Sequence, residues 1–151
     1  MNNDNDKKME NPVEDPKPVA EGMPVAEKAP TEKEVREGIL RNLSKGVIEL
    51  EMPIKAGDAE IKELHYDFNK IRGQDYIDAM DSDIKAQNAF KISNKQAFEL
   101  FLKSAGALNK GVDEKDLRDR MSTPDIIAAV RISLIFFVTK SRGVDERIKS
   151  V

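Results

Sequence analysis

The stretch TPDIIAAVRISLIFFVTKSR, residues 123–142, is the last long apolar run of the chain and decides the fold. Thr123 is a good N-cap residue, Pro124 suits the first helical position, and Asp125 suits the positive end of a helix dipole. At the other end, basic residues precede Gly143, which can adopt the conformation that ends a helix. These signals predict one long helix over residues 123–142.

Apolar residues occur on nearly all sides of this predicted helix. One stripe at helical spacing is expected to face the core, and its members are Ile126, Ile127, Val130, Leu134, Phe137 and Val138. A second apolar set, Ile132, Ile135 and Phe136, lies on the opposite side. Such a helix is either central in the fold or shared with a partner, and the sequence leaves both open. Arg131 interrupts the run, so it is too short to span a bilayer.

Composition indicates a small, helix-rich protein with a heavily solvated surface. The chain has 151 residues, of which 35% are charged and 5% aromatic, and its net charge is −3. This charge gives no reason to expect a nucleic-acid partner. The chain contains no cysteine, which fits a reducing cytoplasm, and no apolar signal segment stands at its start.

Residues 1–38 differ in composition from the rest of the chain. They hold five of the seven prolines, no aromatic residue, and ten acidic against six basic residues. Such a segment buries too little apolar surface to offset its chain entropy, so we expect a disordered acidic tail, with the domain at residues 39–151. Thr31, with Glu34 three residues later, allows a brief helix over residues 31–40.

A β-hairpin is predicted next. Ile48, Leu50, Met52 and Ile54 alternate with polar residues or proline, as in a half-buried strand, and Lys55–Asp58 reads as a turn. In the following run, residues 59–68, Ile61 is out of phase with Leu64, Tyr66 and Phe68. A bulge near Lys62 or Glu63 would bring the two halves into phase.

Three shorter helices are expected between the hairpin and the long helix. The first covers residues 74–88 with Tyr76, Ile77, Met80 and Ile84 inward. The second begins at a capping box of Ser93 and Gln96 and runs to Ala105, with Gly106 to end it, and the third is capped by Asp113. The predicted class is therefore α+β: a disordered N-terminal tail, then a β-hairpin followed by a small helical bundle with one long C-terminal helix.

No catalytic, cofactor or metal constellation is apparent in the sequence. His65 is the only histidine, and its place in the predicted strand points it to solvent. The acidic run that includes Asp81 and Asp83 lacks the glycine and the closing glutamate of a calcium loop. We therefore expect a non-enzymatic interaction domain with no cofactor and no metal.

The order of several short patterns resembles that of bacteriophage tail assembly chaperones, the family that serves long-tailed phages. The resemblance covers about residues 43–139 and rests on Ile48–Ile54, Gly57-Asp58, Ile61–Leu64, Gly73–Asp75, Ala105-Gly106, the capped segment at Leu117, Pro124–Ile127 and Phe136-Phe137. These are degenerate patterns rather than a catalytic signature. The N-terminal tail lies outside the resemblance.

The resemblance implies a protein that acts in the host bacterial cytoplasm while the phage tail is built. Such proteins bind the tape measure protein, keep its apolar helices from aggregating, and help to recruit tail tube subunits; many phages also make a longer, frameshifted product. The surplus apolar face of the long helix, Ile132, Ile135 and Phe136, is the expected partner-binding surface, for the tape measure protein or for a second copy of the chain. A structural tail or connector component of the virion, joined through the hairpin edge, is the alternative.

Overall fold

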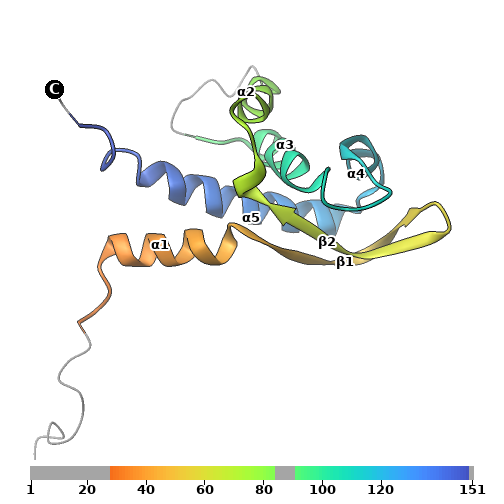
Figure 1. The fold of residues 1–151 in the computed structure, drawn as a ribbon, viewed down its shortest axis with the longest axis horizontal. Helices are drawn as coiled ribbons and strands as arrows, with labels where there is room; N and C mark the ends of the chain where they lie inside the picture. The colour runs from red at the N-terminus through yellow and green to blue at the C-terminus, as the bar shows by residue number, and fades with distance from the viewer. Residues whose placement is uncertain (1–27, 84–90, 150–151) are drawn as a thin grey trace, which may run out of the picture. The chain divides into compact units, whose positions relative to one another are not determined.

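The computed structural model describes residues 28–83 and 91–149 and has an α+β fold (Figure 1). Its compact unit begins at Thr31. The elements are, in order, α1 (Glu32–Leu43), β1 (Lys45–Ala56), β2 (Ala59–Asp67), the 3-10 turn η1 (Phe68–Lys70), α2 (Gly73–Asp81), α3 (Asn94–Ala105), α4 (Glu114–Arg120) and α5 (Thr123–Arg142). The predicted hairpin, shorter helices and long final helix are therefore confirmed.

The helix α1 occupies part of the predicted tail. Thr31 and Glu34 form the capping box that allowed a brief helix there, and the helix continues to Leu43. It packs on α5, with Leu40 and Leu43 partly buried and Arg36 paired with Glu146. The compact unit thus begins ahead of the predicted boundary at residue 39. The rest of the predicted tail, residues 1–27, lies outside the described residues.

The hairpin is antiparallel, and its two strands are joined through Gly57-Asp58. Gly57 has φ +65°, a left-handed conformation that glycine adopts without strain. Near Ser44, Gly46 stands opposite Tyr66, and a β-carbon at Gly46 would lie 3.0 Å from the Tyr66 hydroxyl. The glycine therefore lets the tyrosine ring lie across the neighbouring strand.

The irregularity expected in the hairpin is present, but its extra residues lie in β1. Glu49 pairs with Glu63 and Ile54 with Ile61, so residues 50–53 of β1 stand opposite Lys62 alone. The strand is bulged there, which brings Ile54 back to the core at 2% exposure. Met52, expected inward by strict alternation, is instead 61% exposed.

Asp125 of α5 binds the bulge. Its carboxylate oxygens accept hydrogen bonds from the backbone N–H of Glu51 at 2.8 Å and of Met52 at 3.2 Å. The Ser122 hydroxyl donates a third, at 2.7 Å, and the whole Asp125 residue is only 2% exposed. Ser122 is also the N-cap of α5, so the prediction that Thr123 caps this helix is wrong by one residue. The bulge and the start of α5 are one hydrogen-bonded unit.

The buried face of α5 is not the predicted one. Its buried residues are Asp125, Ala129, Ser133 and Phe136, spaced three or four apart. Ala129 and Ser133 have no exposed surface, which fits close packing between α5 and α3. Leu134 and Phe137, expected in the core, are only half-buried, and Ile127 is 56% exposed. Small residues at this contact let the helix backbones approach, so the bulky side chains are left at its sides.

The shorter helices follow their predicted caps, with one difference. The boxes Ser93/Gln96 and Asp113/Asp116 are both formed, which confirms the starts of α3 and α4. The first part of the helix predicted over residues 74–88 is present as α2, which ends at Asp81, so the prediction is wrong for Ser82 and Asp83. The rest of the predicted helix, including Ile84, lies outside the described residues. Tyr76 and Ile77, expected inward, are 42% and 51% exposed. The residue of α2 that is buried is Ala79, so the helix faces the core with a different side from the predicted one.

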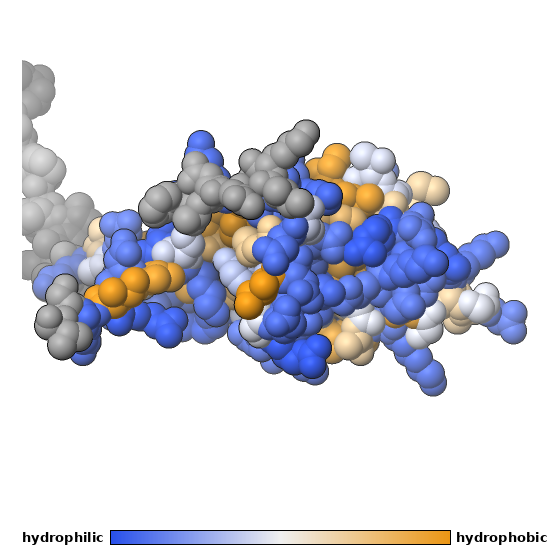
Figure 2. Space-filling model, turned by 90° about the horizontal axis from the view of Figure 1, so that it is seen from above, coloured by the Kyte–Doolittle hydropathy of each residue, from blue (hydrophilic) through white to orange (hydrophobic). Residues whose placement is uncertain are grey.

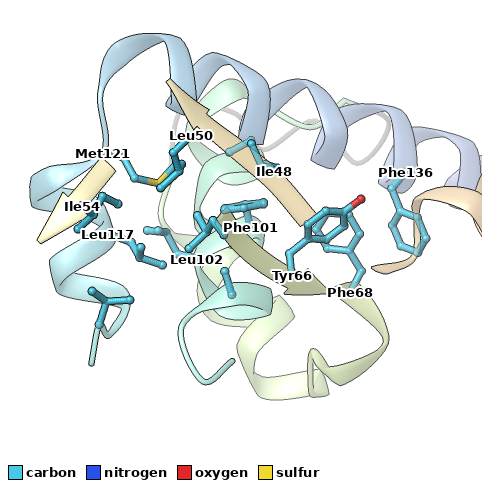
Figure 3. Close-up of a cluster of buried hydrophobic side chains, with 14 residues drawn as sticks. Ile48, Leu50, Ile54, Tyr66, Phe68, Phe101, Leu102, Leu117, Met121 and Phe136 are labelled. Carbon is cyan, nitrogen blue, oxygen red and sulfur yellow. The ribbon is translucent and has the colours of Figure 1, made fainter. Parts of the chain in front are cut away.

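The core lies where the hairpin meets α3, α4 and α5 (Figure 3). At one end, the rings of Phe68 and Phe136 stack with centroids 4.8 Å apart, and Tyr66 lies 5.7 Å from Phe101. At the other end, Ile54 meets the side chains contributed by α4 and the residue that follows it, Leu117 and Met121. The hairpin is thus held on the helices by its whole inner face, as a two-stranded sheet requires.

Candidate interaction surface

The side of α5 that runs past the start of α3 carries the largest exposed apolar side chains of the helix. Val130 and Leu134 each follow a buried residue by one position, which turns them about 100° away from the buried face, while Ile126 is half-buried against the core. Ile127 and Ile135 are turned further and are 56% and 44% exposed. This face of α5 is therefore apolar, and the described elements cover it only in part, leaving Ile127 and Ile135 exposed.

These side chains form a shallow groove of about 700 Å³, which we call the α5 groove. It is lined by Asn94, Ile126, Ile127, Val130, Arg131, Leu134 and Ile135. Arg131 is its single charged residue. Figure 2, a view from above, shows a mainly hydrophilic surface that hydrophobic patches interrupt. An uncovered apolar groove on such a surface is typical of a site that binds another protein.

The three residues predicted to bind a partner do not share one exposed face. Ile135 is exposed and lines the groove, as expected. Ile132 is half-buried against the core, and Phe136 is 2% exposed within the aromatic cluster. The expectation of a common outer face is therefore wrong for Phe136, because its ring packs on Phe68. The exposed surface is built mainly from residues that the hydrophobic stripe had placed inside.

The sequence did contain a signal for the correct face. Ala129 and Ser133 are two of the small residues of α5, and unlike Ala128 and Ser141 they are buried. They stand four apart, on a line that begins at Asp125. A line of small residues allows close helix packing, whereas a stripe of large ones gives no preference when both sides of the helix are apolar. A prediction based only on the spacing of hydrophobic residues therefore placed the wrong side of α5 in the core.

The edges of the hairpin are covered in part by side chains. The amide of Asn109 accepts a hydrogen bond from the His65 N–H and donates one to the His65 carbonyl, each at 2.9 Å. It also donates to the Ala105 carbonyl. The amide thus stands where a third strand would pair beside β2, and Asp125 does the same for the bulge of β1. The His65 side chain is exposed, as predicted.

The titratable groups with shifted pKa values lie in helix caps, in ion pairs and, for Tyr66, in the core. A hydrogen bond from Arg72 lowers the pKa of Asp75, and hydrogen bonds to Glu99 raise the pKa of Arg118. A backbone N–H at Asp116 lowers the pKa of Asp113, and burial raises the pKa of Tyr66. Each of these shifts has a structural cause, and none marks a proton-transfer pair.

Residues 28–83 and 91–149 contain neither a candidate metal site nor a helix that could span a membrane. Within them, no three His, Cys, Asp or Glu side chains are close enough to hold a metal ion. Nor does any helix in these ranges have the length and apolar character needed to cross a bilayer.

Comparisons with protein-family models, with curated proteins and with solved structures found no match to this chain. The resemblance to tail assembly chaperones therefore stays a prediction from the sequence.

Proposed function

We propose that the chain is a non-enzymatic tail assembly chaperone of a long-tailed phage, which holds an apolar helix of the tape measure protein in the α5 groove. The observation that carries this proposal is the division of α5 into two faces. One face is fixed in the core by the small Ala129 and Ser133 and by the Phe136 ring, while the other presents large apolar side chains to solvent. A rigid helix with an uncovered apolar face suits capture of a partner helix that would otherwise aggregate.

The groove offers enough apolar surface for reversible binding. Covering the exposed parts of Ile127 and Ile135 would contribute about 1 kcal/mol each, and the half-buried Leu134 would add somewhat less. A partner helix with apolar residues three and four apart would contact all of them along the groove. Association costs several kcal/mol of lost freedom, so one groove supports transient binding, as a protein absent from the finished virion needs.

Co-purification with the tape measure protein tests the proposal. The tape measure protein of the same phage, the product of the very long helical gene expected immediately downstream, would be co-expressed with a tagged copy of this chain. The double substitution Ile127→Ser with Ile135→Ser should abolish capture. The matched control is Val35→Ser with Val47→Ser, since these residues are 47% and 49% exposed but lie outside the groove.

Capture that survives the groove substitutions, or that fails equally in the control, would refute the assignment of the groove. Circular dichroism of both variants checks that they fold. Sedimentation of the same variants tests whether the groove also joins two copies of the chain. If it does, the Ile127→Ser with Ile135→Ser variant should be more monomeric than the Val35→Ser with Val47→Ser control.

The structure offers less support for the alternative function, a structural component of the virion. That reading relied on strand addition at the hairpin, and both strands have backbone groups already bonded to Asn109 or Asp125. Its test is direct: the chain should be detectable in purified virions if it is structural, and absent from them if it acts only during assembly.

A further inference from the structure

A second apolar cavity, separate from the α5 groove, lies where α2 approaches the C-terminal end of α5. Its volume is about 840 Å³, and we call it the C-terminal pocket. It is lined by Phe68, Ile71, Arg72, Gly73, Tyr76, Phe137, Val138, Lys140, Ser141, Arg142, Val144 and Asp145. None of these residues lines the α5 groove.

Aromatic rings form the floor of the C-terminal pocket. The Phe137 ring lies 5.2 Å from Phe68 and 6.3 Å from Tyr76, measured between centroids. Phe137 is half-buried and Tyr76 is 42% exposed, so both rings are accessible from outside. Rings held by such contacts give a partner side chain a flat, pre-organised surface at low entropic cost.

Positive charge surrounds this floor. Arg72, Lys140 and Arg142 are exposed members of the lining, and Asp145 is the one acidic member. Arg72 is paired with Asp75, but within residues 28–83 and 91–149 no carboxylate lies within ion-pair distance of Lys140 or Arg142. The helix dipole favours cations at this end of α5, and the Lys140 ammonium also lies 5.5 Å from the centre of the Phe136 ring.

We propose that the C-terminal pocket binds an acidic segment of a partner protein, which rests one large apolar side chain on the floor formed by Tyr76 and Phe137. Carboxylates on either side of that anchor would meet Lys140, Arg142 and Arg72. Charge complementarity selects this occupant over a basic segment, because the lining carries more positive than negative groups. An aromatic anchor in a pocket with a charged rim is a common centre of binding energy. The proposal does not depend on the identity of the natural partner.

Two synthetic peptides of about 14 residues test this proposal, since a segment of that length spans a pocket and its rim. Both have Phe and Leu at the centre, and they differ only in Glu or Lys at the flanking positions. Titration calorimetry with the full chain should show the Glu peptide binding about tenfold more tightly, because several exposed charge pairs together amount to roughly 1.4 kcal/mol.

Matched variants locate the binding site. Lys140→Gln with Arg142→Gln should weaken binding of the Glu peptide about fivefold, because each exposed charge pair contributes only a small part of the affinity. Lys62→Gln with Lys110→Gln removes two exposed cations that do not line the pocket and should leave binding unchanged. Tyr76→Ala should weaken the binding of both peptides, because it removes one of the rings that form the floor of the pocket.

Equal affinity for the Glu and Lys peptides would overturn the proposal. So would an equal loss in the two charge variants, or a loss only in Ile127→Ser with Ile135→Ser, which would place the peptide in the α5 groove. Arg72→Gln provides an independent check of the rim, since the Arg72 side chain is 82% exposed and its removal leaves α5 intact.

Discussion

Asp125 should be one of the most sensitive positions for stability, although it is a charged residue. Its carboxylate accepts three hydrogen bonds, from the N–H groups of Glu51 and Met52 and from the Ser122 hydroxyl. Asp125→Asn keeps the shape of the side chain but replaces one acceptor oxygen with an NH₂ donor. Whichever way the amide turns, at least one donor of the bulge or cap then faces another donor.

The expected cost follows from these contacts. One buried N–H left without an acceptor costs about 1–3 kcal/mol. Loss of the negative charge in the first turn of α5 adds about 0.3–1 kcal/mol. We therefore expect Asp125→Asn to lower the free energy of unfolding by about 2–3 kcal/mol, or roughly 10 °C in Tm.

Urea unfolding followed by circular dichroism measures this change, and Asp119→Asn is the matched control. Asp119 lies exposed on α4, so its substitution should alter the free energy of unfolding by less than about 0.5 kcal/mol. If Asp125→Asn falls within that same margin, the carboxylate does not hold the bulge, and the reasoning fails.

Three other predictions concern the core, the hairpin edge and pH. Phe136→Ala should cost about 3–5 kcal/mol in urea unfolding, whereas Ile135→Ala should cost under about 1 kcal/mol, and similar costs would contradict the assigned faces of α5. Asn109→Ala should cost about 1–3 kcal/mol by leaving backbone groups of β2 unpaired. It should also raise self-association in sedimentation, and an unchanged monomer fraction would show that this edge is blocked by something else. Asp75 has a folded pKa below its ordinary value of 3.8, so its contribution to stability is full above that value and is lost as pH falls through the folded pKa. The urea midpoints of wild type and Asp75→Asn should therefore differ above pH 3.8 and approach each other as the pH falls below it, and a constant difference would assign the effect to something other than titration.

Local signals in the sequence were sufficient to predict most of the elements. The capping boxes at Thr31, Ser93 and Asp113 each depend on two residues that are three positions apart, so they can be recognised from the local sequence alone. Strand alternation located the hairpin for the same reason. The bulge was expected from Ile61 being out of phase, but which strand carries the extra residues depends on Asp125, more than seventy positions away.

The candidate site was harder to predict because it depends on which side of α5 faces the core. Ile127, Leu134 and Phe136 are similarly apolar, and nothing in their spacing distinguishes them. The contact with α3 made the choice, by requiring Ala129 and Ser133 at the point of close approach. Ile135 was correctly predicted to be exposed. The burial of Phe136 was not predicted, because it depends on contact with Phe68 in another element.

The use of small residues on the buried face of α5 separates two kinds of mutational freedom. Enlarging Ala129 or Ser133 would force the helices apart, at about 1–3 kcal/mol each, so those positions allow little change. Ile127 and Ile135 contribute little to holding the fold, and exchanging them for other side chains costs little stability. One helix can therefore acquire a new binding preference by substitutions on its outer side while its inner side stays constant. A protein built this way can follow a changing partner without first having to become more stable.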